Sequence, residues 1–170
     1  LAARAGHARA CRELLAAGAD ASRAKEGGVT ALLAAAAAGS VECVRALIAA
    51  GVFLDAANDH GVTPLQMGAH KNEAGVVQAL LAQNADVRAV DRAGNTALHK
   101  AARAEAVDAL RALIAHSQQP AGDADTEAPP LLSQRNEAGH TALDAWVEHA
   151  EMEDGAREVA RLLLGAHALD

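Results

Sequence analysis

The sequence contains eight histidines, two cysteines and 22 acidic residues, the side-chain types from which metal sites and many catalytic centres are built. Their spacing gives no such site, because no two histidines follow a His-x-x-x-His pattern and the cysteines do not form a Cys-x-x-Cys pair. His140 and Asp144 lie on either side of an expected helix start, and Asp144 with Glu148 forms an i, i+4 pair of carboxylates. No nucleophile or third ligand accompanies them, so a solvated helix face is the better interpretation. The sequence therefore predicts no catalytic residue, no metal site and no bound cofactor.

The cysteines and glycines also have structural explanations. Cys11 and Cys43 fall at adjacent positions of the apolar stripes of two expected helices, where a buried cysteine behaves as a small hydrophobic residue. This interpretation is favoured over a redox or metal-binding role. The glycines recur at fixed intervals along the chain rather than in a phosphate-binding loop. We therefore expect a protein that is not an enzyme.

Composition limits the fold and the partners. Hydrophobic residues make up 51% of the 170 residues, but 47 of them are alanine and only two are aromatic, which favours close helix stacking through small side chains. The net charge of −7 disfavours a nucleic-acid partner, since phosphate binding needs a basic face. The sequence contains no run of 18 apolar residues, so it predicts no membrane insertion. We expect an intracellular location, cytoplasmic or nuclear, with organelles left open.

The elements that position these residues repeat along the chain. Thr30, Thr63 and Thr96 are separated by 33 residues, and pairs of large apolar residues and turn positions keep the same period. The apolar pairs are Leu14–Leu15, Leu47–Ile48, Leu80–Leu81 and Leu113–Ile114, and the turn positions are Gly18, Gly51, Asn84 and Ser117. A period of 33 with two helices and a turn in each copy is typical of a solenoid, whose units bury their apolar faces against their neighbours.

Residues 58–89 show the local chemistry of one copy. Thr63 is suited to cap a helix that begins at Pro64, because proline has a preset φ and needs no hydrogen-bond donor in the first turn. Large apolar residues within 76–81 form one stripe of a second helix. Asn84 stands where the chain must reverse, in a left-handed conformation that glycine and asparagine adopt most easily.

Four stretches share one motif: residues 28–39 (GVTALLAAAAAG), 61–72 (GVTPLQMGAHKN), 94–105 (GNTALHKAARAE) and 139–146 (GHTALDAW). Together with the AGAD and NAD turns at 17–20 and 84–86, they resemble the ankyrin repeat over nearly the whole chain. The resemblance implies an all-α ankyrin-repeat solenoid of stacked helix-turn-helix units with projecting turns. We place about five repeats in a single domain: 1–24 (partial), 25–57, 58–90, 91–117 and 136–170, with an insertion loop at 117–135. The partial first copy suggests a fragment of a longer protein.

Several positions depart from the repeat pattern. Asn72 and Asn84 stand where glycine is usual and should preserve the left-handed turns, whereas Glu105 and Ser117 fit less well. The insertion is rich in proline and acidic residues, which favours an extended projecting loop. Its Leu131–Leu132 pair either folds back on the body or contacts a partner.

Three features of the surface have two interpretations each. The alanines from Ala34 to Ala38 make a smooth stretch of the inner face, which favours tight packing over space for a partner's bulky side chain. Phe53 is expected to cover the helix pair beneath its turn rather than to contact a partner. Trp146 is expected to seal the end of the core, with a groove contact as the alternative.

The resemblance also implies where a partner binds, at positions that flank the Gly-x-Thr motif and follow the first helix of each repeat. The partner-binding candidates are His60, His70, Lys71, Arg92, Asn95, Arg103, Arg135, His140, Trp146 and His149. The same positions include Arg4, Glu26, Val29, Asp59, Val62, Val90, Glu137 and Glu148. Fixed charges on this face nearly cancel, so it is the least repulsive region for an acidic or amphipathic segment. His99 matches the histidine of the family's Thr-Pro-Leu-His motif and is expected to be structural, bonding to backbone.

These observations predict a non-catalytic protein–protein interaction module. It would bind another protein through its concave face and turn tips, or dock as a subunit of a larger assembly. The alternative is a targeting or regulatory ankyrin segment of a larger enzyme whose catalytic part is absent from this chain. Fold alone does not decide between them, because repeat stacks serve unrelated pathways by varying their surfaces.

Overall fold

Helices account for all the regular secondary structure in the parts of the chain that the computed structural model describes, which are residue 3 and residues 7–118, 130–147 and 154–167. The α-helices are α1 (Ala8–Ala16), α2 (Ala31–Ala37), α3 (Val41–Ala49), α4 (Pro64–His70), α5 (Ala74–Leu81), α6 (Ala97–Arg103), α7 (Val107–Ser117), α8 (Ala142–Val147) and α9 (Asp154–His167). Two 3₁₀-helices, η1 (Glu26–Gly28) and η2 (Leu131–Ser133), interrupt the loops.

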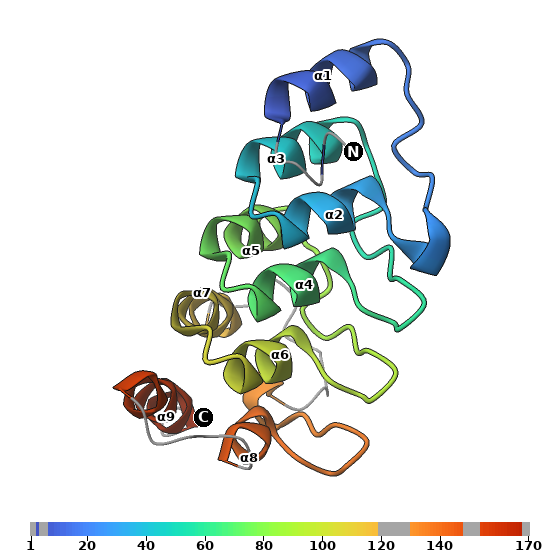
Figure 1. The fold of residues 1–170 in the computed structure, drawn as a ribbon. Coiled ribbons are helices and arrows are strands. Elements are labelled where there is room, and N and C mark those ends of the chain that lie inside the picture. Colours follow the sequence, from blue (N-terminus) through green and yellow to red (C-terminus); the bar gives the residue numbers. More distant parts are fainter. Residues whose placement is uncertain (1–2, 4–6, 119–129, 148–153, 168–170) are drawn as a thin grey trace.

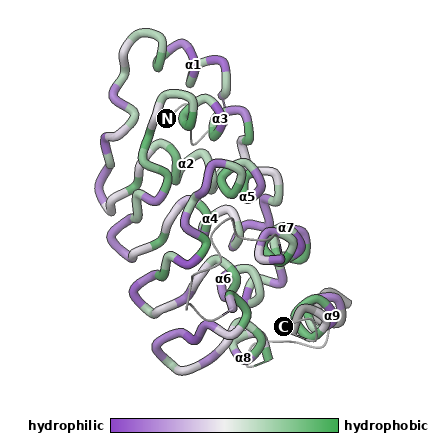
Figure 2. The backbone as a smooth tube through the Cα atoms, turned by 180° about the vertical axis from the view of Figure 1, so that it is seen from behind, coloured by the Kyte–Doolittle hydropathy of each residue, from purple (hydrophilic) through white to green (hydrophobic). Residues whose placement is uncertain are grey.

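The helices form two parallel rows (Figure 1). Helices α2, α4, α6 and α8 make one row, each packed on the next, and α1, α3, α5, α7 and α9 make the other. The loops that precede α2, α4, α6 and α8 project from one side of the stack, and these turns carry mainly hydrophilic residues (Figure 2). The all-α solenoid expected from the sequence is confirmed.

Threonine side chains start the helices of the first row. Thr30 Oγ1 accepts a hydrogen bond from the Leu33 N–H at 3.2 Å, which satisfies one of the free donors of the first turn. Thr63 and Thr96 cap their helices in the same way. The side chain three residues later also accepts a hydrogen bond from the backbone N–H of each threonine, so that each forms a capping box. Pro64 occupies the first position of α4, as predicted.

The core lies between the two rows and combines large aliphatic residues with alanine. Leu47, Leu80 and Leu113 of the second row are at most 1% exposed, and each fully buried leucine contributes on the order of 2 kcal/mol of hydrophobic stabilisation. Small residues face them from the first row, including Ala35 and Ala101, which are completely buried. Close approach of the rows therefore depends on small side chains. Leu14 of α1 is 53% exposed, because α3 is the one helix that packs closely on α1 among the described residues.

Successive projecting turns are joined by backbone hydrogen bonds. The donors and acceptors are Asp59 N–H to Gly27 O (3.0 Å), Arg92 N–H to His60 O (3.1 Å) and Glu137 N–H to Ala93 O (3.1 Å). Gly94 shows why glycine is needed beside these contacts: its φ is +74°, and an added Cβ would lie 2.6 Å from the backbone nitrogen of the next turn.

The turns that follow several of the helices adopt the left-handed conformations that the sequence predicted. Asn72 and Asn84 have φ values of +59° and +60°, and Glu105 is forced to +51°. The prediction of a turn at Ser117 is wrong, because this residue is the last of α7. Its hydroxyl donates to Ile114 O at 2.7 Å, and serine, unlike glycine, strongly disfavours a positive φ, so the helix continues.

Asn72 has a second role that its own repeat does not explain. Its Oδ1 accepts hydrogen bonds from the N–H groups of Asp108 (3.0 Å) and Ala109 (3.1 Å), in the first turn of α7. The residue that precedes α7, Ala106, has no side-chain acceptor. The neighbouring repeat therefore supplies the cap that α7 lacks.

Two aromatic residues and the end of the insertion complete the fold. Leu131 and Leu132 fold back on the body, where they are 6% and 4% exposed, while residues 119–129 of the insertion lie outside the described chain. Trp146 is half-buried and packs against the core, as expected for a residue that seals its end. The expectation that Phe53 covers the helix pair is wrong: it is 72% exposed, because Val52 and Leu54 on either side turn inward in its place.

Candidate interaction surface

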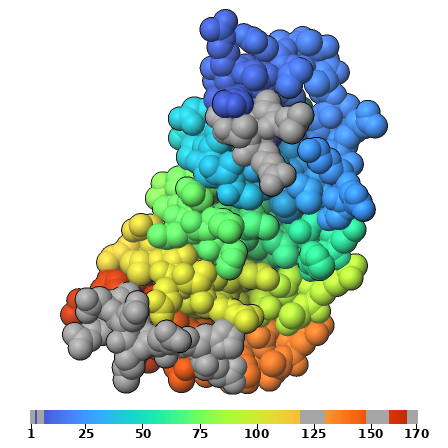
Figure 3. All heavy atoms as spheres, in the orientation of Figure 1, coloured from blue at the N-terminus to red at the C-terminus, as the bar shows by residue number. Residues whose placement is uncertain are grey.

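The exposed sides of α2, α4, α6 and α8, with the turns that precede them, form one continuous surface, here called the groove face. Its repeats follow one another as successive bands in the space-filling view (Figure 3). Two hollows lie on it, one at α2 and the other between the repeats that contain α6 and α8.

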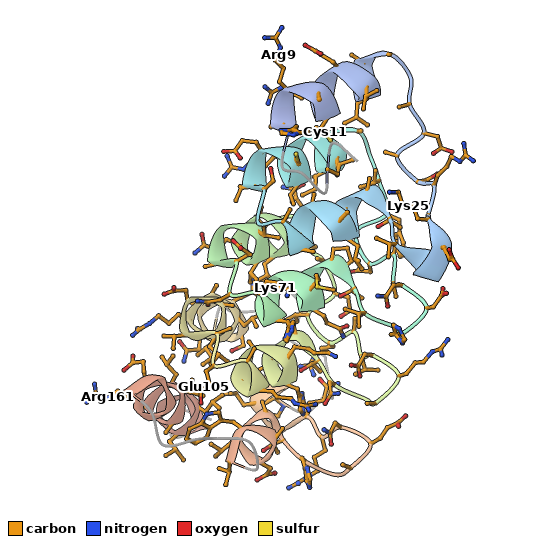
Figure 4. The ribbon with its side chains drawn as sticks, viewed as in Figure 1. Arg9, Cys11, Lys25, Lys71, Glu105 and Arg161 are labelled. Carbon is orange, nitrogen blue, oxygen red and sulfur yellow. The ribbon has the colours of Figure 1, made fainter. Side chains whose placement is uncertain are left out.

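The first hollow, here called the alanine hollow, has a volume of about 540 Å³. It is lined by Ala3, Arg23, Lys25, Glu26, Val29, Thr30, Ala31, Leu33, Ala34, Ala37 and Ala38. It exists because α2 presents alanine at three positions where α4 has Met67, His70 and Lys71, which all carry longer side chains. Lys25 stands beside it on the turn side of α2 (Figure 4).

Four basic side chains meet on the next part of the groove face and are here called the cationic cluster: His70, Lys71, Lys100 and Arg103. The pKa of His70 lies below its usual value, first because the ring is partly shielded from water and then because the other three cations repel its charged form. Lys71 lies at the C-terminal end of α4 (Figure 4). Lys100 is paired with Asp91 at 2.5 Å, whereas no carboxylate among the described residues lies within 4 Å of Lys71 or Arg103.

The second hollow, here called the polar hollow, has a volume of about 490 Å³ and joins the last two repeats. Its lining residues are Ala93, Asn95, His99, Lys100, Arg103, Asn136, Glu137, Ala138, His140 and Ala145. Two members of the cationic cluster therefore line it. Although burial alone would raise the pKa of Asp91, hydrogen bonds from Lys100 and from backbone N–H groups lower it, so this carboxylate stays charged and holds Lys100 in place.

His99 is structural, as the sequence predicted. It is 2% exposed; its Nδ1 lies 2.8 Å from Thr96 Oγ1, and its Nε2 lies 3.0 Å from the carbonyl oxygen of His140 in the next repeat. Burial lowers the pKa of His99, so the ring is neutral at pH 7. Gln66 holds the same position one repeat earlier and donates from Nε2 to Ala89 O (2.8 Å) and Asn95 O (3.0 Å).

The other predicted contact residues divide into exposed and engaged side chains. His60 and Arg92 are exposed on successive turn tips. Asn95 is half-buried, and its amide oxygen accepts from Asn136 Nδ2 at 2.9 Å. Arg135 is exposed, and its Nη1 lies 3.6 Å from Asp144 Oδ2. The same nitrogen donates a hydrogen bond to the carbonyl oxygen of Gly139.

His140 and Trp146 lie in the last described turn and helix of the groove face. His140 is half-buried on the polar hollow. The indole nitrogen of Trp146 is buried without a partner among the described residues. The remaining candidate, His149, lies outside the described residues, as do Arg4 and Glu148.

Lys100 is one of the groove residues that the sequence prediction did not include, as are Arg23, Lys25 and Asn136. The contact positions inferred from the repeat flank the motif or follow the first helix, whereas Lys100 lies four residues after Thr96, within α6. The signal was available, since the equivalent residues Ala34 and Met67 show that this helix position faces the groove and varies between repeats.

Nothing in the described residues gathers the side chains needed to hold a metal ion. None of the helices in these ranges combines the length and the apolar character needed to cross a bilayer. What the stack presents is a long, hollowed surface of varied side chains on a row of packed helices. These features define a helical solenoid built from stacked repeats.

The chain belongs to the ankyrin-repeat family. A family model described as ankyrin repeats (3 copies) matches residues 1–91 and again residues 69–170. Ankyrin repeats are generally protein–protein interaction modules. A search of curated proteins finds no match.

Proposed function

We propose that this chain is a non-catalytic binding module that holds a segment of another protein along the groove face. The supporting observation is the cationic cluster. On a chain of net charge −7, four basic side chains converge on one surface, and two of them lack a carboxylate neighbour in the described chain. Charges that have no carboxylate partner in the described chain are candidates for pairing with a ligand, and unlike charges on the two partners would steer their association.

An acidic or amphipathic segment is the ligand that best matches this surface. Lys71 and Arg103 would pair with carboxylates, and Arg103 offers the planar fork that binds a carboxylate with two hydrogen bonds. Arg92 and His60 on the turn tips would extend the contact along one edge. The hollows give room for side chains of the ligand to enter.

Affinity capture from the native source with matched variants tests this proposal. The bait variant Lys71→Glu/Arg103→Glu reverses two exposed charges on the groove face. The control Arg12→Glu/Arg45→Glu makes the same change of net charge on exposed positions of α1 and α3. We expect proteins retained by the wild-type chain and by the control to be depleted about tenfold with the groove variant. Equal retention by all three baits would refute binding through this face.

A further inference from the structure

We propose that the groove face reads two different features in a fixed order: a bulky apolar side chain in the alanine hollow and carboxylates over the cationic cluster. This inference rests on the proposed function and specifies the chemistry of its ligand. It predicts a linear segment in which an apolar anchor is separated by a defined distance from at least two acidic residues.

The alanine hollow is suited to an apolar anchor. It is lined by Ala34 and Ala37 with Val29 and Leu33, and the charged residues Arg23, Lys25 and Glu26 also line it. An aromatic or aliphatic side chain that enters such a hollow loses its contact with water, which is how anchor residues supply most of the affinity at protein interfaces.

At α4 the cationic cluster carries long side chains where α2 has alanines. Met67, His70 and Lys71 of α4 fill the positions that alanines leave open on α2. The same register on α6 is occupied by Lys100 and Arg103. The groove face therefore changes from a hollow lined by alanines at α2 to long, mostly basic side chains at α4 and α6, and a ligand with the opposite order of features would place its bulky anchor against these filled positions.

The spacing of the helices sets the spacing in the ligand. Helices α2, α4 and α6 pack on one another in sequence, and packed helices lie about 8–10 Å apart. The anchor and the carboxylates are thus separated by about 10–20 Å, the distance from α2 to α4 or α6. An extended segment rises about 3.3 Å per residue, so the acidic residues should lie about three to six positions from the anchor.

Panning random linear peptides displayed on phage against the wild-type chain tests the inference without a known partner. We expect enriched peptides to contain a large aromatic or aliphatic residue with acidic residues at this spacing. Synthetic copies, labelled for fluorescence anisotropy, should bind about tenfold more weakly to Lys71→Glu/Arg103→Glu and in high salt. Affinity for the control Arg12→Glu/Arg45→Glu should stay within about twofold.

A second variant tests the anchor separately. Ala34→Met/Ala37→Gln fills the hollow without a change of charge, and methionine is already tolerated at this register in Met67. We expect it to weaken the same peptides about tenfold, with circular dichroism and the melting temperature unchanged. Retained affinity would show that the hollow is not the anchor site and would overturn the inference.

The remaining outcomes separate this inference from the proposed function. Enriched peptides that respond to the groove variants but are neutral or basic would overturn the inference and leave the proposed function standing. Peptides that respond to none of the groove variants would count against both. Self-association of the wild-type chain in sedimentation equilibrium, lost in Ala34→Met/Ala37→Gln, would assign the hollow to a second copy and would also overturn the inference.

Discussion

The cap that Asn72 supplies to α7 can be measured by comparing two asparagines with the same backbone conformation. Asn72 and Asn84 have φ values of +59° and +60°, but only Asn72 accepts hydrogen bonds from another repeat. Substitution with glycine removes up to about 1 kcal/mol of strain from the left-handed backbone of the folded state. Because glycine also raises the conformational entropy of the unfolded chain, it stabilises the unfolded state by a similar free energy. For Asn84→Gly we therefore expect a change in the free energy of unfolding of less than about 0.5 kcal/mol.

Asn72→Gly removes the cap as well. Its Oδ1 bonds the two N–H groups at 3.0 and 3.1 Å, the positions that a capping residue normally serves. Loss of such a cap costs about 1 kcal/mol, with a usual range of about 0.5–2 kcal/mol. We expect Asn72→Gly to be less stable than Asn84→Gly by this amount in urea denaturation, and to melt about 2–4 °C lower.

A rescue variant separates the cap from other effects of Asn72. Ser40 stands at the position of Ala106 two repeats earlier, and its hydroxyl accepts from the Cys43 N–H at 3.4 Å to cap α3. Ala106→Ser in the Asn72→Gly background should therefore restore most of the lost stability. Equal stabilities for the two glycine variants, or no recovery on adding the serine, would refute the inter-repeat cap.

Three further predictions follow from the turns and from the buried histidine. Glu105→Gly should stabilise the protein by about 0.5–1 kcal/mol in urea denaturation, because it relieves a φ of +51° in a non-glycine residue; an unchanged midpoint would show that this conformation is not strained. Gly94→Ala should lower the melting temperature markedly more than Gly139→Ala, since both have a positive φ but only at Gly94 would the new Cβ lie 2.6 Å from the next turn; equal losses would contradict the close approach. His99→Gln, which copies Gln66, should preserve the fold and reduce the acid sensitivity of stability. Burial holds the pKa of His99 below its unfolded value of 6.5, so this residue's contribution is complete above that pH and is lost as pH falls below it. Urea denaturation at about pH 7.5 and 5.5 checks this, and an identical loss in the wild type and His99→Gln would refute it.

Features that depend on one repeat could be predicted from the sequence. Threonine caps, the proline at the start of α4 and the left-handed Asn72 and Asn84 follow from local backbone chemistry. The alanine row indicated a smooth groove, although tight packing was the favoured interpretation and the structure shows a hollow in addition. The 33-residue period made the stacking itself predictable, because each unit needs a neighbour to bury its apolar stripe.

Features that depend on two repeats could not be predicted. The positive φ of Asn72 accounts fully for asparagine at that position, so nothing in the sequence indicated that its amide also caps a helix 36 residues later. Phe53 shows the reverse error, since hydrophobicity favours burial but the neighbours on both sides occupy the inward positions.

The residue that follows each threonine cap by three positions determines how firmly consecutive repeats are joined. Gln66 and His99 each tie their own repeat to the next through a buried side chain, whereas Leu33 offers no polar group for such a tie. Among the described residues, the boundary after α3 therefore relies on apolar contact and two polar links near the surface, Asp59 N–H to Gly27 O and Asp86 N–H to Asp55 Oδ1. Opening at this boundary would release α1, α2 and α3 together, so amide hydrogen exchange in these helices should reach completion earlier than in α4 to α7. The stack would then behave as two groups of repeats that differ in their free energy of local unfolding, with the alanine hollow on the less stable group.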